Sequence, residues 1–161
     1  MTDADKADFL ERSQAAALKA DHIWPPYAAC ETALESGWGQ SALAKRANNL
    51  FGQKQGKKIP LPYPCIDMNT EEVYPSGRVV VCATWLVFPD WETCFRERMA
   101  LLRRLPKYYG NALAAQTGEG FVKLVSLTWA TDPHRAEKVL AIHRQFFGGP
   151  RFNNPELLGE S

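Results

Sequence analysis

A single strand-forming region interrupts a chain that otherwise has helical patterns. Residues 67–73 and 78–87 are rich in β-branched and apolar residues, and Pro75-Ser76-Gly77 between them is typical of a turn. Both faces of the second segment are largely apolar, which predicts that the hairpin is partly covered. The predicted layout is therefore helical, with one small β insertion in the middle of the chain.

Helices are predicted on both sides of this hairpin. A capping-box spacing at the N-terminus and the apolar periodicity after it predict a helix over residues 4–20. Pro26 can open a second helix that runs through Glu35, and Gly37 then occupies the position of a left-handed C-terminal cap. Further helical segments are predicted at 40–45, 90–105, 118–127 and 131–146, with a short segment up to residue 115.

Length and composition indicate one globular domain. The 161 residues can bury a real core, since 45% are hydrophobic and 23% are charged. The net charge of +1 gives no strong attraction to nucleic acid, and no apolar run approaches the roughly 18 residues of a membrane span. The acidic N-terminus does not match a secretory signal. We expect one domain over 1–161, with a β lobe at about 53–88 and a loose tail at about 148–161.

The cysteines and histidines do not indicate a metal site. No CxxC pair occurs and the three histidines are scattered, so neither a metal nor a cofactor is predicted. Cys65 and Cys82 flank the hairpin and could form a disulfide, although free thiols are the favoured interpretation. The four cysteines are Cys30, Cys65, Cys82 and Cys94.

The stretch ALESGWG places one carboxylate, Glu35, at the end of the second helix. A carboxylate there faces the negative end of the helix dipole, and shielding by Leu34 and Trp38 would also disfavour its charge. A protonated acid in a cleft can protonate a leaving oxygen. The alternative is a solvated Glu at a helix end. Glu31 lies one turn earlier on the same face, where a solvated or salt-bridged role is favoured.

Three motifs follow one another in the chain: ALESGWG, residues 41–44, and NNLFG at 48–52. Together they closely resemble the glucosaminidase domain of bacterial peptidoglycan hydrolases, glycoside hydrolase family 73. The resemblance continues at 70–73, 85–90 and 130–133, so it spans about residues 9–146. It implies a lysozyme-like α+β fold with a helical lobe, a small β-hairpin lobe and a cleft between them. It also implies cleavage of the β-1,4 bond between N-acetylglucosamine and N-acetylmuramic acid in peptidoglycan.

The resemblance maps the catalytic acid onto Glu35 and a second carboxylate onto the Thr70-x-Glu72 context. Glu72 is preferred over Glu71, and strand alternation puts these two side chains on opposite faces. The second carboxylate would activate water or stabilise positive charge at the anomeric carbon. Inverting, retaining and substrate-assisted mechanisms all stay open, because a sequence gives no distance between carboxylates.

Several other residues are candidates for substrate binding. Asn48 and Asn49 either bind sugar hydroxyls and acetamido groups or hold a tight turn. Phe51 is favoured as a core residue over a sugar platform, and Trp38 is expected to pack beneath Glu35.

The chain departs from the resembling family at two aromatic positions. The family motif Tyr-Ala-Thr-Asp-Pro-x-Tyr is replaced by residues 129–135, with Trp129 and Arg135 in place of the tyrosines. The resemblance implies that the first tyrosine position faces the cleft. Tryptophan keeps the aromatic face but cannot accept a hydrogen bond or relay a proton. Asp132 is expected to be mainly a helix cap, with a proline in the first turn after it.

The implied function is an endo-β-N-acetylglucosaminidase that acts on the cell wall, in the periplasm or outside the cell. Two settings fit: a phage endolysin, or an antibacterial effector with an immunity protein as partner. The glycan strands of peptidoglycan are the expected partner, and a monomer is expected. The alternatives are a muramidase or lytic transglycosylase on the same fold, or an inert glycan-binding module, which the change at Trp129 keeps open.

Overall fold

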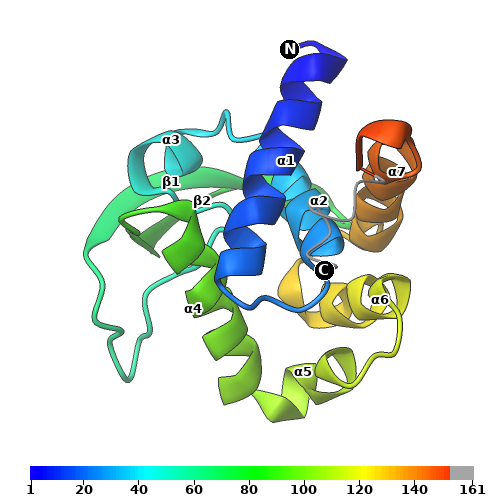
Figure 1. The fold of residues 1–161 in the computed structure, drawn as a ribbon. Helices are drawn as coiled ribbons and strands as arrows, with labels where there is room; N and C mark the ends of the chain where they lie inside the picture. The colour runs from blue at the N-terminus through cyan, green and yellow to red at the C-terminus, as the bar shows by residue number, and fades with distance from the viewer. Residues whose placement is uncertain (153–161) are drawn as a thin grey trace.

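The computed structural model describes residues 1–152, except for the side chains of Glu72 and Val81. The described chain is mostly helical, with one hairpin inserted between the third and fourth helices (Figure 1). The elements are α1 (Asp3–Lys19), α2 (Pro25–Glu35), α3 (Ala42–Ala47), β1 (Cys65–Tyr74), β2 (Gly77–Leu86), α4 (Trp91–Arg104), α5 (Pro106–Leu113), α6 (Gly118–Trp129), α7 (Arg135–Phe147) and the 3-10 turn η1 (Pro150–Phe152).

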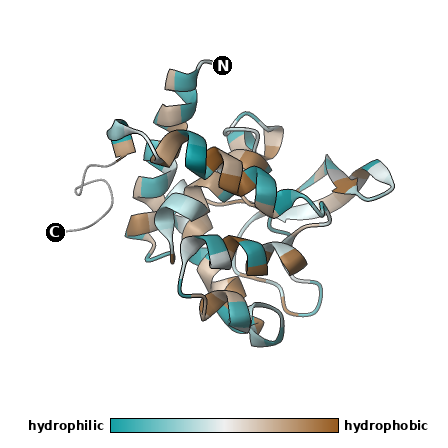
Figure 2. Cartoon of the chain, turned by 90° about the vertical axis from the view of Figure 1, so that its right-hand side faces the viewer, coloured by the Kyte–Doolittle hydropathy of each residue, from teal (hydrophilic) through white to brown (hydrophobic). Residues whose placement is uncertain are grey.

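The core is built around α2. Four small residues of this helix are fully buried, and they allow α1, α6 and α7 to pack closely against it. In Figure 2 the helices carry both hydrophilic and hydrophobic residues, as expected of helices with one buried face. The four small residues are Ala28, Ala29, Cys30 and Ala33.

The hairpin is antiparallel over its whole length. Cys65 pairs with Leu86 and Tyr74 pairs with Gly77, whose φ of +126° favours glycine. The base of the hairpin packs on α3 through a second small core that contains Trp85, whereas Val80 near the tip is 66% exposed. The expected partial covering is therefore confirmed for the base of the hairpin and is wrong for its tip.

The end of α2 is fixed by a Schellman cap. The N–H of Trp38 donates to the carbonyl of Ala33 at 2.8 Å, and Gly37 has a left-handed φ of +56°. Glu35 is consequently the last residue of the helix, as the sequence predicts.

The start of α7 differs from the expectation. The helix begins at Arg135, because the carboxylate of Asp132 accepts from the N–H of His134 at 2.9 Å and stabilises a turn before the helix. Asp132 is thus a turn residue and not the N-cap.

The last described residues also pack onto the helices. Phe152 is buried against Phe147, with ring centroids 4.4 Å apart, and Arg151 pairs with Asp8 and Glu11. The rest of the expected tail, residues 153–161, lies outside the described residues.

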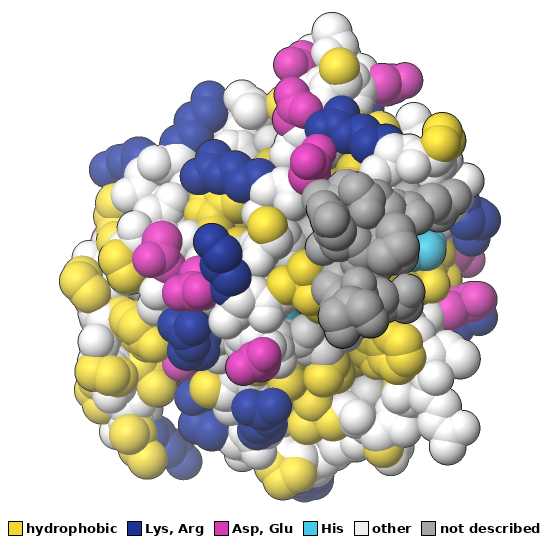
Figure 3. Space-filling model, in the orientation of Figure 1, with side chains coloured by type: hydrophobic (Ala, Val, Ile, Leu, Met, Phe, Trp, Pro, Cys, Tyr) yellow, Lys and Arg dark blue, Asp and Glu magenta, His cyan; other side chains and the backbone are white. Residues whose placement is uncertain are grey.

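Thiols and surface charge agree with the sequence analysis. All four cysteines are free. Cys65 and Cys82 do not face each other, because the strand register pairs Cys65 with Leu86 and Cys82 with Asn69. On the face in Figure 3, basic and acidic side chains are interspersed without a large patch of one sign. No helix within residues 1–152 combines the length and apolarity that a membrane crossing requires.

Candidate active site

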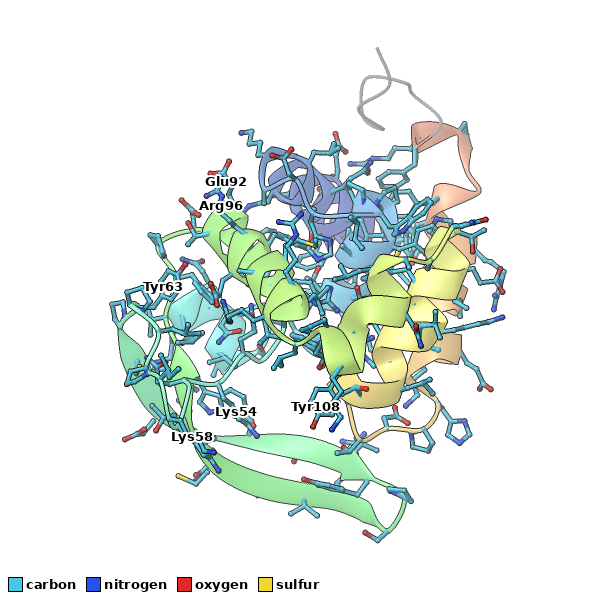
Figure 4. The ribbon with its side chains drawn as sticks, turned by 90° about the horizontal axis from the view of Figure 1, so that it is seen from below. Lys54, Lys58, Tyr63, Glu92, Arg96 and Tyr108 are labelled. Carbon is cyan, nitrogen blue, oxygen red and sulfur yellow. The ribbon has the colours of Figure 1, made fainter. Side chains whose placement is uncertain are left out.

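A cleft of about 920 Å³ lies between the hairpin and the helices. Figure 4 shows the hairpin running below the helices, with Lys54 in the space between them. One wall comes from the hairpin, and the other comes from the end of α2, α5 and the loop between α6 and α7. The cleft brings together these residues singled out from the sequence: Glu35, Asn49, Phe51, Glu71, Trp129, Asp132 and Arg135.

Glu35 reaches the cleft from the last turn of α2. Its side chain is 23% exposed, so a ligand in the cleft can reach it. The Oε1 atom accepts a hydrogen bond from Nε of Arg135 at 2.6 Å. The carboxylate is therefore held in one place by a cation on α7.

Arg135 is itself fixed by three partners. Besides Glu35, its Nη1 atom donates to Oγ of Ser126 at 2.9 Å, and its Nη2 atom donates to Oε2 of Glu31 at 2.7 Å. The side chain is 1% exposed. Burial opposes the charge of Arg135, but the carboxylates of Glu31 and Glu35 hold its pKa above the usual value.

Glu31 joins this arrangement to a second buried cation, Arg98 on α4. Both side chains are fully buried, and Arg98 donates to both carboxylate oxygens of Glu31. Burial alone would raise the pKa of Glu31, yet Arg98 and Arg135 together hold it well below its usual range. Glu31 is therefore salt-bridged, as favoured from the sequence, and it is buried.

The predicted surroundings of Glu35 are wrong in two respects. Trp38 does not shield Glu35, because its left-handed backbone directs the indole onto Phe9 and Phe146, at centroid distances of 6.1 and 5.5 Å. Trp38 lines a separate groove of about 670 Å³ instead of the cleft. The contact with Arg135 also supplies a cation that the argument from the helix dipole did not include.

The amides of the NNLFG segment hold its turn. Asn49 is buried, and its Nδ2 atom donates to the carbonyls of Gln53 and Leu86 while its Oδ1 atom accepts from Gln53 N–H. Asn48 is the left-handed C-cap of α3 and donates to the carbonyl of Phe88. These contacts support the tight-turn alternative, and sugar binding by either residue stays a prediction.

Phe51 and Trp129 enclose the guanidinium of Arg98. The carbon Cζ of Arg98 lies 4.3 Å from the ring centroid of Phe51 and 4.4 Å from that of Trp129. Phe51 is a core residue, 2% exposed, and it also lines the cleft. Tryptophan is the aromatic side chain that best stabilises a cation on its face, which gives Trp129 a physical role in place of tyrosine.

The choice of a second carboxylate stays a prediction. Glu71 lines the cleft, and its exposed carboxylate lies 3.4 Å from Nη1 of Arg78. Glu72 pairs with Val79 across the hairpin, and its side chain lies outside the described residues.

A hydrogen bond joins the tip of the hairpin to the loop between α6 and α7. The hydroxyl of Thr131 donates to the carbonyl of Val73. Next to it, Asp132 pairs with Lys138 at 2.6 Å, and the hydrogen bond from Lys138 lowers the pKa of Asp132. The two lobes are thus in contact at this end of the cleft.

Sequence reasoning missed the buried cations. Arg98 occupies the apolar stripe of α4 with Phe95, Met99 and Leu102, which is the spacing of a buried face. A cation on such a stripe must have a buried anion as partner. The spacing of α4 could therefore have predicted that Arg98 is buried and paired.

Residues 12–147 match the glucosaminidase family, described as mannosyl-glycoprotein endo-beta-N-acetylglucosaminidase. The chain belongs to the glucosaminidase family. This membership confirms the resemblance drawn from ALESGWG and NNLFG. The resemblance places the catalytic acid at Glu35 and a tyrosine at the position of Arg135, and both placements stay predictions.

Two bacterial relatives show how much of the chain is shared. Peptidoglycan hydrolase FlgJ of Salmonella typhimurium is 30% identical over 148 residues, covering 88% of this chain and 46% of FlgJ. Exo-glucosaminidase LytG of Bacillus subtilis is 30% identical over 130 residues, covering 78% of this chain and 45% of LytG. The chain thus spans less than half the length of these relatives.

Solved structures have the same fold. The catalytic domain of the autolysin Auto from Listeria monocytogenes aligns with a TM-score of 0.72 at 25% identity, covering 91% of this chain and 86% of that one. A glycoside hydrolase domain of Salmonella typhimurium FlgJ aligns with a TM-score of 0.69 at 27% identity, covering 89% and 99%. The expected α+β fold with a helical lobe and a hairpin lobe is confirmed.

Proposed function

We propose that this chain is a peptidoglycan hydrolase that cleaves the β-1,4 bond between N-acetylglucosamine and N-acetylmuramic acid, with Glu35 as the general acid. The observation that carries the proposal is the position of Glu35: a partly exposed carboxylate, fixed at the end of a buried helix, that faces a cleft in a member of the glucosaminidase family. The relatives named hydrolase and glucosaminidase support the same reaction.

The reaction needs a proton on Glu35 when the glycan is bound. In the mechanism we infer, Glu35 transfers this proton to the glycosidic oxygen as the bond to the anomeric carbon breaks. The hairpin supplies the second carboxylate, which activates water or stabilises the positive charge that develops on the sugar. The family resemblance favours Glu72 for this role, whereas Glu71 is the alternative that lines the cleft. Participation of the N-acetyl group is the alternative to this second carboxylate.

Product analysis tests the proposal. Purified peptidoglycan is digested with the wild type and with Glu35→Gln, and the products are reduced with borohydride and identified by mass spectrometry. The proposal predicts reduced N-acetylglucosamine at the new ends, from the wild type only.

Each other result points to an alternative. Reduced muramic acid ends would identify a muramidase, and anhydro-muramic ends would identify a lytic transglycosylase. Binding to peptidoglycan without products would identify an inert glycan-binding module.

We further propose that the protein acts on the wall from outside the cytoplasm, as an endolysin or as an antibacterial effector. An effector would require an immunity protein that blocks the cleft. Expression in the cytoplasm should then be harmless, whereas the same chain exported to the periplasm should lyse the cell, and exported Glu35→Gln should not. Lysis by the exported Glu35→Gln protein would contradict this.

A further inference from the structure

We propose that Tyr109 is a substrate-binding residue, whose phenol hydroxyl donates a hydrogen bond to the acetamido carbonyl of an N-acetylated sugar in the cleft. The inference rests on the proposed function and deepens it, because it takes the ligand to be the N-acetylated glycan. Tyr109 belongs to α5, on the wall opposite the hairpin, and it lines the same cleft as Glu35.

The side chain of Tyr109 is buried, but its hydroxyl has no partner on the described protein. The residue is 6% exposed, and the hydroxyl makes no hydrogen bond to any residue within 1–152. Buried tyrosine hydroxyls are usually hydrogen-bonded. We therefore expect a bound ligand to supply the partner.

The hydroxyl of Tyr109 is open to the cleft. Among the described residues, the fully enclosed side-chain atoms without a partner are Oε1 of Gln53, Oγ1 of Thr70 and Nε of Arg98. The hydroxyl of Tyr109 is not one of these atoms, so it keeps contact with open space, and the open space that Tyr109 borders is the cleft. A ligand in the cleft can therefore reach it.

The hydroxyl is able to donate at neutral pH. Burial raises the pKa of Tyr109 above its usual value of 10.0, although the nearby charges of Arg98 and Arg135 oppose this rise. The phenol is thus neutral and carries its proton. The same buried cations hold Glu31, so Tyr109 stands close to the ion pairs that fix Glu35.

The surface around this hydroxyl is apolar. The ring of Tyr109 lies 6.1 Å from that of Trp129, and Trp129 lies 5.8 Å from Phe51, measured between ring centroids. Leu105, one turn before Tyr109, lines the cleft with these three residues. A bare sugar ring presents several hydroxyls that all need partners, whereas an acetamido group combines one carbonyl with a methyl group. A wall with one donor on an apolar surface fits the acetamido group better.

The experiment measures binding by calorimetry in the Glu35→Gln protein, so that the ligand is not consumed. Tyr109→Phe, added to this protein, removes only the hydroxyl. Tyr27→Phe is the matched control, because Tyr27 stacks on His143 with ring centroids 3.9 Å apart and lies outside the residues that line the cleft. The ligand is a soluble glycan fragment of peptidoglycan in three forms: N-acetylated, de-N-acetylated and re-N-acetylated.

We expect Tyr109→Phe to raise the Kd of the N-acetylated and re-N-acetylated fragments by roughly 3- to 10-fold, as for the loss of one hydrogen bond. The de-N-acetylated fragment should bind weakly and equally with and without the hydroxyl, and Tyr27→Phe should change none of the three Kd values. An unchanged Kd of the N-acetylated fragment in Tyr109→Phe would overturn the proposal. So would an equal rise for the N-acetylated and de-N-acetylated fragments, because the hydroxyl would then bind another group of the sugar.

Thermal unfolding separates a binding role of the hydroxyl from a structural one. Because the hydroxyl has no partner within residues 1–152, Tyr109→Phe should not lower the Tm, and a clear fall would overturn the proposal.

Failure of the proposed function would be a separate result. If the wild type releases no N-acetylglucosamine ends while Tyr109→Phe weakens binding of the N-acetylated fragment, the proposed reaction fails and the inference stands. If the Glu35→Gln protein does not bind the N-acetylated fragment at all, the inference is overturned, whatever the wild type cleaves.

Discussion

Arg98 and Glu31 form a bidentate ion pair at the centre of the helical lobe, with nitrogen-to-oxygen distances of 2.9 and 2.6 Å and both side chains fully buried. The pair ties α4 to α2, and Arg135 extends it to Glu35. The site is therefore built on the core of the protein and not on a surface loop.

Glu31→Gln should destabilise the protein by about 3–5 kcal/mol, because it leaves two buried cations without their common anion. Urea unfolding measures this loss. Glu119→Gln breaks an exposed pair and should change the free energy of unfolding little. Equal losses from the two substitutions would contradict the buried network.

His22 should make stability depend on pH. Arg98 can only donate, so the Nε2 atom of His22 must accept from it at 3.1 Å, and Nδ1–H donates to the carbonyl of Ile23. Burial, aided by the charge of Arg98, lowers the pKa of His22 to about 3. The stability from neutral His22 is thus complete above its unfolded pKa of about 6.5 and is lost as pH falls from there toward 3.

The free energy of unfolding should therefore fall between pH 6.5 and 5, with a slope from His22 that approaches about 1.4 kcal/mol per pH unit toward pH 5. His22→Gln should remove this slope in urea unfolding measured across the range. His143→Gln is the control, because His143 is only partly buried and should carry less of the slope. The idea fails if His22→Gln keeps the wild-type pH dependence.

Trp129 should contribute more to the stability of the protein, through its contact with the buried Arg98, than to catalysis. Trp129→Leu removes the ring over Arg98 and should cost about 2 kcal/mol or more in unfolding free energy, whereas Trp129→Tyr should cost less. Tyr108→Leu removes an exposed ring near Lys107 and should change little. If Trp129→Leu is as stable as the wild type, the cation–π contact is not a stabilising one.

Substitutions of the two hairpin carboxylates, Glu71 and Glu72, should have different effects on kcat. Glu72→Gln should lower kcat by about 100-fold or more if Glu72 is the second carboxylate, and Glu71→Gln should have little effect. Both variants remove one negative charge from the same strand, so each controls for the other. A larger loss in Glu71→Gln would reverse the assignment.

Local signals predicted the elements well. Pro26 favours the start of a helix and Gly37 favours its end, because each residue acts through its own backbone. The sequence therefore predicted both the start of α2 and the position of Glu35 at its end. Asp132 was misread because its carboxylate bonds to a turn two residues on, and a cap and a turn use the same residue types.

Contacts between elements were not predictable in the same way. Arg98, Arg135 and Glu31 come from three helices, and a sequence does not say which cation faces which anion. Trp38 lies only three residues after Glu35 in the chain, yet the left-handed cap directs its ring into a separate groove. Sequence neighbours at a helix end can thus lie on different faces of the molecule.

The most direct test of the account is the identity of the reducing ends released from purified peptidoglycan by the wild type and by a folded Glu35→Gln protein. The account predicts N-acetylglucosamine ends from the wild type and none from Glu35→Gln. The same ends released at a similar rate by both proteins would contradict the central role of Glu35.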